Sequence, residues 1–174
     1  MTGDVPRSEL RVRFEVLNTE LGRRAIDCEL CTVGGAVMSV VFRTEPSTRH
    51  IRALFGPESL LREAVESVAA ALSLPARWTP ETVHAYIGPG PDSQAFVELS
   101  HLKVYAARPE YLLAMKCAAL RLGPEAGGRD DLQYLLRYLN LSSGEEALRV
   151  VHHYFNERQL PADVRETVDA LLYN

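Results

Sequence analysis

Apolar residues recur with two different periods along this chain, and the change between them near Arg108 most restricts its fold. Before that point, stretches with helical spacing alternate with short runs of β-branched and aromatic residues, which predict strands. After it, apolar residues repeat only at steps of three and four, which predicts helices alone. We therefore expect a mixed part of the α/β (α+β) class over residues 1–107. A helical part over residues 108–174 follows it, packed with it as one unit.

The positions of glycine and proline, together with this spacing, set the bounds of the expected elements. In the first part we predict helices over residues 6–24, 36–42 and 59–74 and strands over residues 29–33, 48–55, 94–98 and 102–106. In the second part we predict helices over residues 110–122, 129–139, 143–155 and 161–172. The third of these begins with a capping box between Ser143 and Glu146.

Composition excludes several classes of protein. The 174 residues, 47% of them apolar, suit one domain with a real core, and the net charge of −4 gives no reason to expect a DNA partner. The longest apolar run, residues 36–42, is too short to span a bilayer, so we expect a cytoplasmic protein without membrane contact. Cys28 and Cys31, three residues apart on a predicted strand, point to opposite faces, which disfavours a metal or redox pair.

A glycine pair, Gly34-Gly35, follows one predicted strand and opens a helix. Such a turn lets backbone N–H groups at a helix N-terminus approach a phosphate. The same residues are also what an ordinary tight turn requires. The pair is thus compatible with phosphate binding without establishing it.

Charged residues on the predicted helices of the second part form another motif. Lys116 falls on the apolar stripe of its helix, where its ammonium needs a carboxylate or a phosphate unless it reaches water. Asp130 and Asp131 fall in the first turn of the next helix, where the helix dipole alone favours acids. The pattern leaves both a structural ion pair and a ligand site open.

With these motifs in this order, residues 26–172 resemble the AbiEii/MenT-like nucleotidyltransferases of bacterial toxin–antitoxin systems, a branch of the polymerase-beta-like superfamily. The resemblance is carried by the segments VGGAVMSVVF (33–42), STRHIRALF (47–55), LREAVESVAAALSLPARW (61–78), VYAARPEYLLAMKCAALR (104–121) and GRDDLQYLLRYLNL (128–141). It implies a minimal nucleotidyltransferase fold with a small mixed sheet. It also implies an NTP and Mg²⁺ as cofactors of any active member.

The resemblance also implies a set of site residues. Positions that would contact the nucleotide or support the site are Gly34, Gly35, Thr48, Arg52, Lys116 and Asp131, the last two as the catalytic pair. In the family, an Asp-x-Asp strand holds the metal ions, since period-two spacing puts both carboxylates on one face. Here His50 and Arg52 stand at those two positions.

The loss of both metal-binding carboxylates at His50 and Arg52 bears most on the expected function. Magnesium takes oxygen ligands, which imidazole and guanidinium do not replace, although an arginine can contact phosphate directly. Glu98 is the remaining candidate for a carboxylate ligand, and its alternative is an ordinary strand residue facing water. The favoured hypothesis is a catalytically degenerate protein that still binds a nucleotide, RNA or a protein partner.

Two alternatives stay open. One is an active enzyme that moves NMP from an NTP to the 3′ end of a tRNA or to a protein hydroxyl. The other is a non-catalytic component of a toxin–antitoxin pair, whose helical part docks a cognate antitoxin.

Overall fold

The computed structural model describes residues 5–33, 37–42, 47–48, 52–56, 58–71, 92–123 and 128–173. The chain divides into two compact units, residues 1–84 with 93–107 and residues 85–92 with 108–174. The first unit contains a mixed sheet with helices and the second is helical, so the α+β class and the helical C-terminal part are confirmed.

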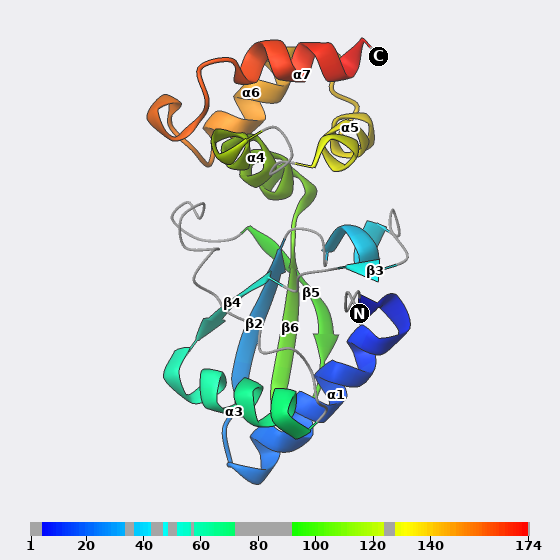
Figure 1. Cartoon of the computed structure of the whole chain (residues 1–174), viewed down its shortest axis with the longest axis vertical. Helices are drawn as coiled ribbons and strands as arrows, with labels where there is room; N and C mark the ends of the chain where they lie inside the picture. The colour runs from blue at the N-terminus through cyan, green and yellow to red at the C-terminus, as the bar shows by residue number, and fades with distance from the viewer. Residues whose placement is uncertain are drawn as a thin grey trace. The chain divides into compact units, whose positions relative to one another are not determined.

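The first unit is built on a four-stranded sheet with the strand order β4-β2-β6-β5 (Figure 1). Its strands are β2 (Cys28–Val33), β4 (Arg52–Gly56), β5 (Ser93–Glu98) and β6 (Leu102–Ala107). β2 pairs antiparallel with β4 and parallel with β6, while β5 pairs antiparallel with β6. The sheet is therefore mixed, as expected.

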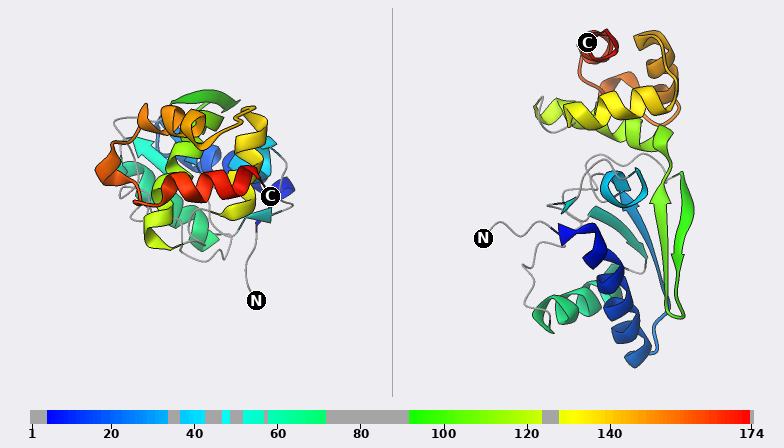
Figure 2. Two further views of the ribbon diagram at one scale, coloured as in Figure 1. Left: turned by 90° about the horizontal axis from the view of Figure 1, so that it is seen from above. Right: turned by 90° about the vertical axis from the view of Figure 1, so that its right-hand side faces the viewer.

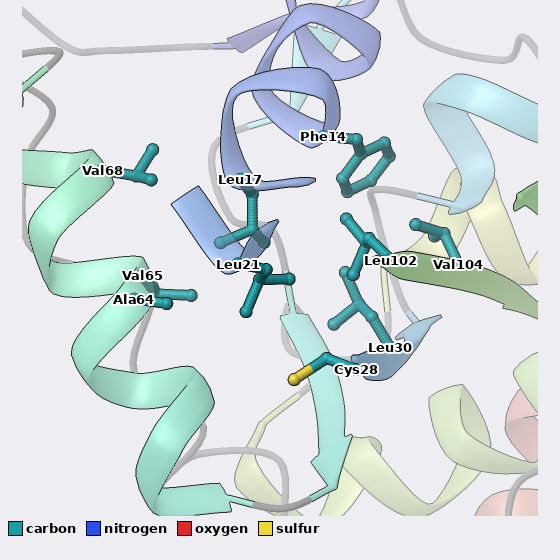
Figure 3. Close-up of a cluster of buried hydrophobic side chains, with 10 residues drawn as sticks. All are labelled: Phe14, Leu17, Leu21, Cys28, Leu30, Ala64, Val65, Val68, Leu102 and Val104. Carbon is teal, nitrogen blue, oxygen red and sulfur yellow. The ribbon is translucent and has the colours of Figure 1, made fainter. Parts of the chain in front are cut away.

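Two helices, α1 (Arg7–Arg23) and α3 (Glu58–Ala71), cover the same face of this sheet (Figure 2). α1 turns its apolar stripe inward because Phe14, Leu17 and Leu21 recur at steps of three and four. Figure 3 shows these side chains between those of α3 and those of β2 and β6. Each large apolar side chain buried in this way contributes about 1.5–3 kcal/mol relative to exposure.

The turn between β5 and β6 is fastened to α1. Asn18 accepts a hydrogen bond from the backbone N–H of His101 (2.8 Å), and Asp27 lies 2.8 Å from the imidazole Nδ1 of His101. A Cβ added at Gly22 would lie 2.7 Å from the imidazole Cδ2, so glycine is what lets this ring reach the helix. The hairpin register is thus anchored at the end of the sheet where β5 finishes.

The second unit consists of α4 (Pro109–Ala119), α5 (Arg129–Tyr138), α6 (Gly144–His152) and α7 (Val164–Leu172), with 3₁₀ turns at Leu120–Leu122 and Glu157–Gln159. Its core comes from the apolar stripes of these helices, including Leu113, Leu132, Leu136, Val151 and Val168. In the parts of the chain that the structure covers, no helix combines the length and apolar character needed to cross a bilayer.

The expected capping box at α6 is only half correct. The Ser143 hydroxyl accepts a hydrogen bond from the Glu146 backbone N–H (3.2 Å), as predicted. The Glu146 carboxylate, however, accepts from the backbone N–H and hydroxyl of Ser142, both at 2.8 Å. These two hydrogen bonds lower the pKa of Glu146. The reciprocal bond therefore reaches one residue further back than the motif implies.

The prediction of a single strand over residues 48–55 is wrong, because the described residues of this segment belong to two strands in different sheets. Ser47–Thr48 forms β3, which pairs antiparallel with β1 (Val5–Pro6) in a separate two-stranded sheet, whereas Arg52–Gly56 forms β4. The pairing partner of Ser47–Thr48 is Val5–Pro6, 42 residues upstream, with Val5 opposite Thr48 and Pro6 opposite Ser47. The sequence around residues 47–48 gives no sign of so distant a partner. The predicted helix over residues 36–42 also differs, since Met38–Phe42 is a π-helix.

Candidate functional site

The sheet of the first unit brings Arg52 next to the strand that leads into the glycine pair. Arg52 is the Cα partner of Val33 across the antiparallel pair of β2 and β4. Val33 is fully buried, and Gly34 follows it directly in the sequence. Gly34, Gly35 and His50 lie outside the described residues. Strand register therefore puts Arg52 opposite the last residue of β2, which directly precedes the glycine pair in the sequence.

Thr48, also assigned to nucleotide binding from the resemblance, lies on a different strand from Arg52. It belongs to β3, where its Cα partner is Val5 of β1. Thr48 and Arg52 consequently sit in two different sheets of the first unit. Their backbone positions are no longer related by the period-two spacing of a single strand.

Glu98 is not at the end of the sheet where Arg52 lies. It is the Cα partner of Lys103 on β6, and Lys103 is in turn the partner of Glu29 on β2. Glu29 precedes Val33, the partner of Arg52, by four residues, so Glu98 lies about 13 Å from Arg52 along the strand direction and three strands across the sheet. Its side chain is exposed. Register thus favours the interpretation of Glu98 as a strand residue facing water.

Lys116 and Asp131, the pair carried over from the resemblance, are in contact within the second unit. Lys116 Nζ donates to Asp131 Oδ2 at 2.6 Å, linking α4 to the first turn of α5. Their side chains are only 11% and 14% exposed. Of the partners that the sequence left open for Lys116, the structure supplies the carboxylate. The ammonium does not depend on reaching water.

Gly128 is a residue whose role the sequence analysis missed. It caps α5 with a φ of +69°, and a Cβ built there would lie 3.3 Å from Asp131 Oδ2 and 3.4 Å from Lys116 Nζ. Glycine alone fits both this left-handed backbone and this close approach. The signal was its place directly before the Arg-Asp-Asp sequence that begins a predicted helix.

A second polar cluster in the helical unit also went unpredicted. Asp92 accepts a hydrogen bond from the Tyr154 hydroxyl (3.0 Å), while Arg108 Nε lies 3.2 Å from its other carboxylate oxygen. The Arg108 backbone N–H donates to the Asp92 carbonyl at 2.8 Å. Burial, and secondly the hydrogen bond to Asp92, raise the pKa of Tyr154 to about 12. This phenol therefore stays protonated at neutral pH and donates its proton to the hydrogen bond with Asp92.

The cysteines are buried, reduced thiols. Burial raises the pKa of Cys31 to about 11 and that of Cys117 to about 12, and it raises the pKa of Cys28 as well. Thiols held so far from ionisation are poor nucleophiles and poor metal ligands at neutral pH. Across the described ranges, no group of three or more His, Cys, Asp or Glu side chains is arranged to hold a metal ion.

Comparison with known proteins adds no relative: no family model, no curated protein and no solved structure matches this chain.

Proposed function

We propose that this chain is a nucleotidyltransferase-like protein that binds the phosphates of a nucleotide without magnesium and does not transfer the nucleotide. The single observation that carries the proposal is the register pairing of Arg52 with Val33, beside the start of the glycine pair. In the resembled family this strand position belongs to a carboxylate that binds metal. An arginine there offers up to five N–H donors to phosphate oxygens.

The residues at the family's metal positions do not fit magnesium. His50 and Arg52 supply nitrogen donors, one of them permanently cationic, where Mg²⁺ requires oxygen ligands. Positive charge beside a glycine turn suits a phosphate, because backbone N–H groups and a guanidinium both favour the anion. Binding of nucleotide phosphate and loss of two-metal chemistry therefore follow from the same substitution.

A labelled-nucleotide transfer assay tests this proposal. The wild type and the H50D/R52D variant are each incubated with α-labelled NTPs, Mg²⁺ or Mn²⁺, total tRNA and cell lysate. We expect label transfer from the wild type to be absent. Transfer by the variant alone would show an intact scaffold that has lost its metal ligands. Transfer by the wild type to tRNA 3′ ends or protein hydroxyls would overturn the proposal in favour of an active enzyme.

The remaining alternative, a non-catalytic component that docks a cognate antitoxin, concerns the helical unit. Large apolar side chains are exposed there at Leu122 (65%), Tyr138 (53%) and Tyr173 (80%). Such residues are common on protein surfaces when scattered singly, so they support docking only weakly. Co-purification with the product of an adjacent small gene is the measurement that favours this alternative.

A further inference from the structure

We draw no further inference here: the strongest candidate, the outer edge of strand β5 with the side chain of Phe96 39% exposed at its bulge, has no strand paired to it among the residues that the structure describes, and nothing in the structure shows what covers it.

Discussion

Val33 and Arg52 are direct Cα partners across the antiparallel strands β2 and β4, so Arg52 lies opposite the residue that directly precedes the glycine pair in the sequence. Under the family resemblance, Arg52 is a cation at a position where the enzymes of that family carry a metal-binding carboxylate. The proposed loss of metal chemistry and the proposed retention of phosphate binding therefore share one structural cause.

Replacement of Arg52 by alanine is expected to weaken nucleotide binding. A charge-assisted hydrogen bond contributes about 1.5–3 kcal/mol, so we expect the Kd for ATP to rise by roughly one to two orders of magnitude. Arg11, exposed on α1 and paired with Glu15 at 3.4 Å, gives the control variant R11A. Fluorescence titration with a labelled ATP analogue measures both. Equal affinities of R52A and R11A would show that Arg52 takes no part.

Loss of either Lys116 or Asp131 is expected to destabilise the second unit, and loss of both is expected to cost less than the sum of the two single losses. K116M or D131N alone removes one side of this mostly buried ion pair and should lower the free energy of unfolding by about 3 kcal/mol. The double variant should lose at least about 1 kcal/mol less than the sum of the two. Urea unfolding measures the cycle.

The same cycle on Lys103 and Asp130 provides the control, because both side chains are exposed and substitutions of surface charges usually change stability by only about 0.5 kcal/mol. Strict additivity of K116M and D131N would contradict the ion pair between these two side chains. Since Lys103 and Lys116 are the only two lysines of the chain, the two cycles use all of them.

Much of the fold was predictable because local periodicity decides it. α1, β2, β5, β6 and α5 begin and end within one or two residues of the predicted bounds, since each carries its own apolar pattern. The division of residues 48–55 between two sheets was not predictable. It depends on pairing with Val5–Pro6, a contact that no local pattern encodes.

The candidate site was predictable in its residue types but only partly in its geometry. The apolar stripe around Lys116 left a carboxylate, a phosphate or water open as its partner, and the structure shows the carboxylate of Asp131. The distance between Glu98 and Arg52 depends on the register of β4, β2, β6 and β5 together, which the spacing of residues along one strand cannot give. The close approach of Gly128 likewise depends on how α4 and α5 pack.

Replacement of Gly144 by alanine is expected to destabilise the protein, which is the opposite of the usual effect of a glycine-to-alanine change on stability. Such a change normally stabilises by about 0.4–1 kcal/mol where the backbone permits it. Here an added Cβ would lie 2.6 Å from Asp169 Oδ1, the atom that accepts the Gly144 N–H at 2.7 Å. G144A should therefore destabilise the protein by about 1–2 kcal/mol.

Thermal unfolding in two backgrounds measures this effect. In a D169A background the obstructing carboxylate is gone, and the same glycine-to-alanine change should become neutral or stabilising. A G144A variant as stable as the wild type would show that α6 and α7 are not packed in this way.

Stability is expected to fall at alkaline pH because of Cys117. Burial raises the pKa of this thiol from its usual 9.0 to about 12, so above pH 9.0 the unfolded chain releases a proton that the folded chain keeps. The free energy of unfolding then decreases as pH rises, by about 1.4 kcal/mol per pH unit, while below pH 9.0 this thiol adds no dependence.

Urea unfolding of the wild type and C117A at about pH 8 and about pH 10.5 isolates this contribution, which should amount to roughly 2 kcal/mol. Other groups titrate in both proteins and cancel in the comparison. The same pH dependence in C117A as in the wild type would contradict the burial of this thiol.

Isothermal titration of the wild type with ATP, once with excess EDTA and once with magnesium, tests most directly whether this chain binds nucleotide phosphate without metal. Arg52 in register with Val33 predicts measurable binding in EDTA, with a Kd within about twofold of that in magnesium, because a guanidinium needs no metal to bind phosphate. Binding that requires magnesium, or no binding in either condition, would contradict the account.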